Sequence, residues 1–104
     1  MTSRRRLPNR RNSTSFGIEV AGLRYIATIS YFPGTNELAE IFLTNHRAGS
    51  DAGAAACDSA VVCSIALQHG VPLKTIRKAL MRDARGKART PLGAALDLLA
   101  EENR

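Results

Sequence analysis

The chain has 104 residues, an apolar fraction of 44% and a net charge of +6, which together describe one small basic domain. Tryptophan is absent and aromatic residues make up 5%, so we expect a core of Ala, Val, Ile and Leu. No apolar run reaches the roughly 18 residues that a membrane span needs, and no apolar segment follows the Arg-rich start. We therefore expect a cytoplasmic protein with no membrane partner.

The positive charge lies in two blocks on either side of a mildly acidic body. The first 14 residues hold five arginines and no acidic residue. Residues 72–89 hold seven lysines or arginines, opposed only by Asp83. This uneven distribution favours a polyanionic partner such as DNA, RNA or a nucleotide.

The first half of the chain predicts an arm and a sheet. Residues 1–14 are polar and Arg-rich with nothing to bury, so we predict a flexible arm. Three strand-like segments with alternating apolar residues follow, at residues 15–21, 23–32 and 37–44. Short turn sequences separate them, Ala21-Gly22 and Pro33-Gly34-Thr35-Asn36, which predicts an antiparallel meander.

The alternation also assigns residues to the two faces of this sheet. We expect Glu19 and Glu40 to face solvent. Three large apolar side chains are expected on the face away from the core: Ile26, Phe32 and Phe42.

The second half of the chain predicts helices. A long helix is expected at residues 52–67, capped by Ser50 or Asp51 and ended by Gly70. Pro72 begins a short second helix, which turns Leu73, Ile76 and Leu80 inward and Lys74, Arg77, Lys78 and Met81 outward. A polar loop and a third helix, residues 92 to about 102, follow.

These elements predict an α+β fold, a three-stranded antiparallel sheet followed by a two-helix hairpin, with a flexible basic N-terminal arm and a short C-terminal helix. We place the boundaries at residues 1–14 for the arm, 15–82 for the domain, and 83–104 for the loop and last helix. The long helix is apolar around most of its circumference. A single three-stranded sheet cannot cover that much apolar surface. That surplus predicts self-association, most simply a two-fold homodimer.

The stretch from Ala60 to Pro72, AVVCSIALQHGVP, ends an apolar helix and leads through Gly-Val-Pro into a short one. After three strands, this order resembles the TSCPD domain, which occurs at the C-terminal end of adenosylcobalamin-dependent ribonucleotide reductases and as small standalone proteins. The resemblance covers about residues 7–81, and Ala48-Gly49-Ser50 before the long helix agrees with it. It implies a β-β-β-α-α domain. It also implies an accessory domain or trans-acting subunit of a ribonucleoside-diphosphate reductase, with the large subunit as partner in deoxynucleotide synthesis.

The chain departs from that family where catalysis is concerned. The Thr-Ser-Cys-Pro-Asp motif is absent, and Met81-Arg82-Asp83-Ala84-Arg85 stands after the second helix instead. There is no C-terminal cysteine pair and no room for the reductase barrel that binds nucleotide and cobalamin. Cys57 and Cys63 lie six residues apart on a helix and point in different directions, so they predict no metal site. We expect no catalytic residues and no cofactor. His46, just before the long helix, is the only polar side chain that we single out as a possible functional group.

The most direct interpretation is a non-catalytic binding or regulatory module that attracts an anionic partner. Nine cations are its candidate contacts: Arg4, Arg5, Arg6, Arg10, Arg11, Lys74, Arg77, Lys78 and Arg82. Two other interpretations stay open. The arm can be a solubilising tail only, and the segment from Gln68 to Leu80 resembles the turn and second helix of a helix-turn-helix DNA-binding regulator.

Overall fold

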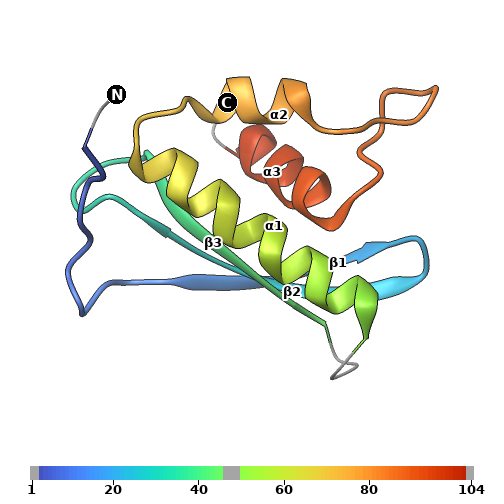
Figure 1. The fold of residues 1–104 in the computed structure, drawn as a ribbon, viewed down its shortest axis with the longest axis horizontal. Helices are drawn as coiled ribbons and strands as arrows, with labels where there is room; N and C mark the ends of the chain where they lie inside the picture. Colours follow the sequence, from blue (N-terminus) through green and yellow to red (C-terminus); the bar gives the residue numbers. More distant parts are fainter. Residues whose placement is uncertain (1–2, 46–49, 103–104) are drawn as a thin grey trace.

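The computed structural model describes residues 3–45 and 50–102. Three strands are followed by three helices (Figure 1): β1 (Thr14–Val20), β2 (Leu23–Tyr31), β3 (Leu38–Asn45), α1 (Asp51–Gln68), α2 (Leu73–Ala79) and α3 (Pro91–Glu102). The strands form one antiparallel sheet in the order β1-β2-β3. The predicted α+β fold is confirmed.

A two-residue loop joins β1 to β2. Val20 pairs with Leu23, so Ala21 and Gly22 alone make the turn. Both have positive φ, 52° and 78°, as a tight hairpin turn of this length requires. The pairing of β2 with β3 is regular up to Ser30 and Glu40 and then shifts, so that Tyr31 pairs with Leu38.

Helix α1 lies along β3 and covers its outer edge. Ser50 caps the helix by accepting a hydrogen bond from the backbone N–H of Gly53 at 3.0 Å. Near the other end of the helix, the amide of Gln68 donates to the carbonyl of Ala39 at 3.1 Å, and Ser64 bonds to the backbone of Ile41. Side chains of α1 thus form hydrogen bonds with backbone groups of β3 on the edge where no neighbouring strand lies.

The core lies between the sheet and the helices. From the sheet it takes Ile18, Tyr25, Ala27, Ile29, Leu38, Ile41 and Leu43, and from α1 it takes Ala56, Ala60, Cys63 and Leu67. Helix α3 adds Leu92, Ala95, Leu96 and Leu99, all buried. The core therefore continues beyond residue 82, the predicted end of the domain. The inward residues predicted on α2, Leu73, Ile76 and Leu80, pack against this core as partly buried side chains.

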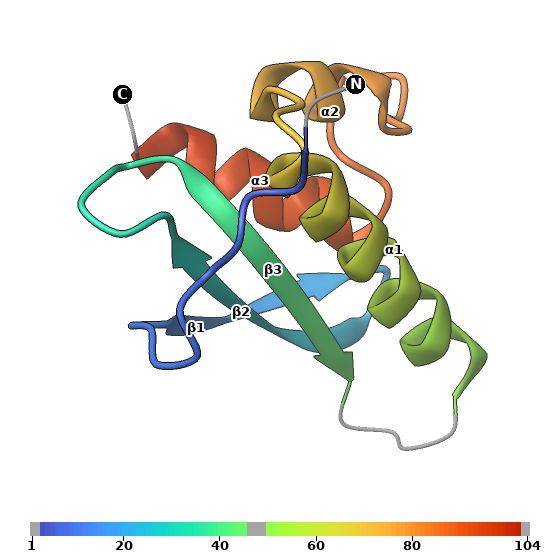
Figure 2. The ribbon, with the colours of Figure 1, turned by 60° about the vertical axis from the view of Figure 1, so that its left-hand side comes forward.

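The opposite face of the sheet is partly covered by the N-terminal segment. Figure 2 shows residues 3–13 running from the C-terminal end of α1 across β3 to the start of β1. Beneath this segment Phe32 and Glu40 are only 4% and 6% exposed. The prediction that Glu40 faces solvent is therefore wrong, because the N-terminal segment covers the part of the sheet where Glu40 lies. Phe42, farther along β3, is 43% exposed as expected, and Glu19 is also exposed.

Candidate anion-binding surface

The first arginines of the arm are bound at the C-terminal end of α1. The backbone N–H of Arg5 donates to the carbonyl oxygen of Gln68 at 2.7 Å, and Nε of Arg4 donates to the Gln68 side-chain oxygen at 2.7 Å. Carbonyl groups at the end of a helix lack partners within it and carry partial negative charge, which favours cations there. The guanidinium of Arg5 also lies 3.6 Å from the ring centre of Phe32 and bonds Glu37 at 2.9 Å.

A second contact fixes the arm over the sheet. Arg11 donates from Nε and Nη2 to the two carboxylate oxygens of Glu40, and the hydroxyl of Ser30 donates to the same carboxylate. Burial by itself would raise the pKa of Glu40, but the hydrogen bonds from Arg11 and Ser30 outweigh it and leave that pKa lowered. Glu40 is therefore a charged group held inside the structure by its partners.

These contacts change the interpretation of the arm. We expected it to have nothing to bury, yet Arg4, Arg5 and Arg11 are each bound to another part of the fold. The positive charge of Arg11 neutralises a buried acid, and its role is structural. The predicted flexibility of the arm in solution stays a prediction.

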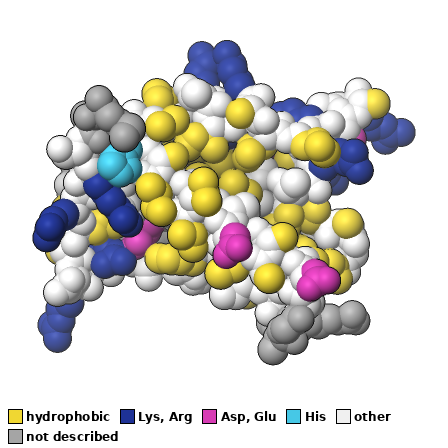
Figure 3. All heavy atoms as spheres, viewed as in Figure 1, with side chains coloured by type: hydrophobic (Ala, Val, Ile, Leu, Met, Phe, Trp, Pro, Cys, Tyr) yellow, Lys and Arg dark blue, Asp and Glu magenta, His cyan; other side chains and the backbone are white. Residues whose placement is uncertain are grey.

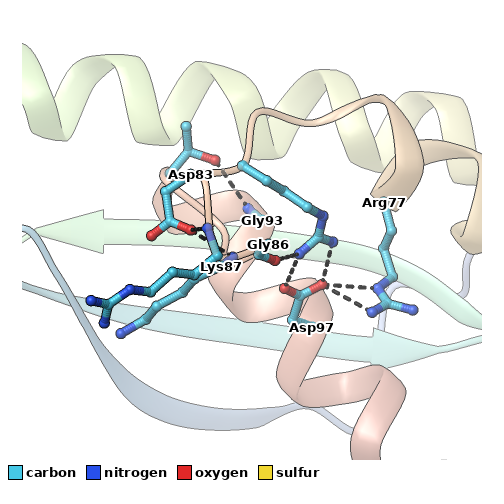
Figure 4. A network of polar contacts seen from close by, with 9 residues as sticks. Arg77, Asp83, Gly86, Lys87, Gly93 and Asp97 are labelled. Carbon is cyan, nitrogen blue, oxygen red and sulfur yellow. Dashed lines mark hydrogen bonds and ion pairs between the residues drawn. The ribbon is translucent and has the colours of Figure 1, made fainter.

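The second basic block contains a similar structural cluster, centred on Asp97 of α3. Arg77 of α2 donates from Nε and Nη2 to Oδ1 of Asp97 at 3.1 and 3.0 Å (Figure 4). Arg82 donates to both carboxylate oxygens, at 2.7 and 2.8 Å. The hydrogen bonds from Arg82, and less strongly those from Arg77, outweigh burial and lower the pKa of Asp97. The prediction that Arg77 points outward is wrong, because it joins α2 to α3.

The connection between α2 and α3 is organised by another acid. One carboxylate oxygen of Asp83 accepts hydrogen bonds from the backbone N–H groups of Arg85 and Lys87, both at 2.9 Å. Arg82 also donates to the carbonyl of Gly86 at 3.0 Å. The backbone is thereby closed into a tight loop, and the side chains of Arg85, Lys87 and Arg89 are exposed around it.

The structure thus separates the basic residues into two groups. Five are bound within the fold: Arg4, Arg5, Arg11, Arg77 and Arg82. Seven exposed side chains of the two blocks bind no other described residue: Arg6, Arg10, Lys74, Lys78, Arg85, Lys87 and Arg89. The candidate residues chosen from the sequence omit the last three, although the charge count of residues 72–89 already included them.

Lys and Arg side chains are not gathered into one continuous patch on the face that Figure 3 shows. On the face shown in Figure 3, Lys and Arg side chains lie around the border, while apolar side chains occupy the middle over α1. Five of the seven lie close together in the chain, on α2 and the connection that follows it. Arg6 and Arg10 belong to the arm, which meets the fold near the C-terminal end of α1.

Side chains that could hold a metal ion are not clustered in the described part of the chain. Across residues 3–45 and 50–102, no three His, Cys, Asp or Glu side chains are close enough to hold a metal ion together. Burial raises the pKa of the Cys63 thiol to about 11, so at neutral pH it stays protonated and unreactive. His46, Arg47, Ala48 and Gly49 lie outside the described residues.

None of the helices in the described ranges is long and apolar enough to cross a bilayer. Comparisons of the chain with protein-family models, with curated proteins and with solved structures found no match. The resemblance to the TSCPD domain therefore stays a prediction from the sequence.

Proposed function

We propose that this protein is a non-catalytic module that binds nucleic acid through the exposed cations of α2 and the α2–α3 connection. The surface consists of Lys74, Lys78, Arg85, Lys87 and Arg89. Its support is the division of the basic residues described above. The two neighbouring acids, Asp83 and Asp97, are each held by other groups, and these five cations have no carboxylate partner in the described structure.

Binding on such a surface is electrostatic. A protein that neutralises five phosphates of duplex DNA releases about five counterions, which gives a slope of log affinity against log salt of about −4.5. Affinity then falls by about 500-fold between 50 and 200 mM salt. Lysines and arginines on a short helix and a loop contact the phosphate backbone without reading bases, so we propose binding with little sequence preference.

A helix-turn-helix mode of binding is less well supported. Helix α2 is seven residues long and Lys74, Thr75 and Lys78 are exposed on it, as that interpretation requires. Its partner α1, however, packs one face on β3 and exposes Val61, Val62 and Ile65 on another. Those apolar side chains offer nothing to a phosphate backbone.

The proposal includes a cytoplasmic location and a homodimer as the working state. A role as an accessory subunit of a ribonucleotide reductase is supported by the sequence resemblance alone. Co-purification with a large cobalamin-dependent subunit, or faster turnover of that subunit when this chain is added, would support the reductase role instead.

Fluorescence anisotropy with labelled duplex DNA, single-stranded DNA and single-stranded RNA, each from 50 to 200 mM salt, tests the proposal. The decisive variant replaces the five exposed cations, Lys74, Lys78, Arg85, Lys87 and Arg89, with Gln. We expect it to lose most of the salt-dependent affinity while its melting temperature stays within a few degrees of the wild type.

The matched control replaces Arg77 and Arg82, two bound cations of the same block, with Gln. We expect this control to lower the melting temperature and to reduce the salt slope much less. A wild-type protein that binds none of the three nucleic acids at 50 mM salt would overturn the proposal. So would a five-cation variant with an unchanged slope.

A further inference from the structure

Helix α1 has an outer apolar face that the fold leaves open. Its inner residues pack on β3, yet Val61, Val62 and Ile65 on the outer side are 42%, 67% and 39% exposed. Ala54 and Ala55 extend this surface by two turns towards the helix start and are also exposed. Asp58 also lies on this outer side, but most of the exposed side chains around it are apolar, and an exposed apolar surface of this kind indicates an interface.

Charge is distributed unevenly along the same helix. The charged residues of α1 are Asp51 and Asp58, both exposed and both in its N-terminal half. At the C-terminal end, Arg4 and Arg5 are bound to Gln68, Arg6 follows them in the chain, and Lys74 lies six residues after Gln68 in the first turn of α2. Figure 3 shows acidic side chains over the N-terminal half of α1 and Lys and Arg side chains at its other end, with apolar surface between.

We infer that the occupant of this face is a second copy of the chain, bound through α1 in antiparallel orientation about a two-fold axis near Val61 and Val62. A helix of 18 residues is about 27 Å long. Antiparallel pairing therefore sets the acidic half of each α1 against the basic end of the other, and it does so twice. Parallel pairing would set acid against acid and base against base.

The surface is self-complementary in both shape and charge. The valines and Ile65 supply the apolar centre, and the two acid-to-base contacts lie at its borders, where a two-fold interface repeats every contact. Antiparallel helices also place the positive end of each helix dipole beside the negative end of the other. This inference rests on the homodimer included in the proposed function and not on the binding of nucleic acid.

Sedimentation velocity from 5 to 200 µM protein tests the interface with two matched variants. Val62→Glu would place two negative charges, one from each copy of the chain, next to each other at the two-fold axis. Met81→Glu introduces the same charge outside α1, at a side chain that is 62% exposed. We expect wild type and Met81→Glu to dimerise, and Val62→Glu to be monomeric with an unchanged circular dichroism spectrum. A monomeric wild type, or a dimeric Val62→Glu variant, would overturn the inference.

Cross-linking with a short bis-maleimide tests the orientation, in a background where the exposed Cys57 is replaced by Ser. Antiparallel pairing brings two copies of Val62→Cys together and separates two copies of Ala54→Cys by about 22 Å along the helices. We expect only Val62→Cys to cross-link, whereas parallel pairing would cross-link both. Anisotropy and sedimentation on the wild type separate the two proposals. A monomeric wild type that binds nucleic acid contradicts the dimer alone, and a dimeric wild type that binds none contradicts the nucleic-acid proposal alone.

Discussion

The hydroxyl of Ser64 on α1 accepts a hydrogen bond from the backbone N–H of Ile41 and donates one to the carbonyl of the same residue, both at 2.9 Å. Ser64 is 6% exposed and Ile41 fully buried, so water cannot replace either bond. One side chain thus takes the place of a fourth strand at this point of the edge. The pairing of α1 with β3 therefore depends on a polar residue inside an otherwise apolar contact.

Replacing Ser64 with Ala should lower the free energy of unfolding by about 1–3 kcal/mol, because a buried backbone donor and acceptor lose their partner. Urea denaturation followed by circular dichroism measures the change. Ser59→Ala is the control, since its hydroxyl donates only to the carbonyl of Ala56 within the same helix. We expect that variant to stay within about 0.5 kcal/mol of wild type. Equal losses in the two variants would refute this role of Ser64.

The buried pair of Glu40 and Arg11 predicts sensitivity to acid. The pKa of Glu40 is lowered in the folded protein from its ordinary value of 4.5, so the folded state binds this proton less readily than the unfolded chain does. Its stabilising contribution is complete above 4.5 and is lost as the pH falls through the lower, folded-state value. Melting temperatures measured from pH 7 to pH 3 should therefore decline at the acid end.

In this series Glu40→Gln should reduce the acid-dependent part of the decline and lower the melting temperature at pH 7. The control is Glu37→Gln, because the Glu37 side chain is 65% exposed and its contact with Arg5 is screened by water. Its pH profile should follow the wild type. An unchanged acid decline in Glu40→Gln would show that other groups cause it.

Local patterns in the sequence were sufficient to predict the elements. Alternating residues gave the three strands, and the cap at Ser50 and the stop at Gly70 bounded α1 within about one residue. These signals act between neighbours in the chain, so they are visible without the fold. The order of the elements then left few arrangements other than a meander covered by helices.

Contacts between distant segments were not predictable in the same way. Alternation places Phe32 and Glu40 on the far face of the sheet, but it cannot show that the arm returns to cover that face. Likewise, nothing local links Asp97 to arginines 15 and 20 residues earlier in the chain. The candidate residues were chosen by net charge, which does not distinguish a guanidinium bound within the fold from an exposed one.

The cluster around Asp97 predicts opposite effects on stability and binding. Asp97→Asn should lower the melting temperature, since Arg77 and Arg82 lose the carboxylate that joins α2 to α3. The same change releases two guanidinium groups beside the proposed surface, so affinity for nucleic acid should rise and the salt slope should become steeper. Differential scanning fluorimetry and anisotropy measure the two effects.

Asp58→Asn is the control for this experiment. It changes the net charge by the same amount at an exposed position of α1 that bonds neither Arg77 nor Arg82. We expect an unchanged melting temperature and a smaller gain in affinity. If both variants gain equally, net charge and not the released arginines explains the binding.

The turn between β1 and β2 offers a stabilising substitution. Ala21 has a φ of 52°, a left-handed conformation that costs an L-residue other than Asn, Asp or Gly about 1 kcal/mol or more. Ala21→Asn should relieve part of that cost and raise the free energy of unfolding by about 0.5–1 kcal/mol, because Asn-Gly is the preferred pair in such a turn. Gly22→Ala is the opposite test: its φ is 78° and no atom lies within 4 Å of the added methyl group, so any loss reports backbone strain alone. Urea denaturation of both variants should show a gain for the first and a loss for the second, and two changes of the same sign would exclude this turn geometry.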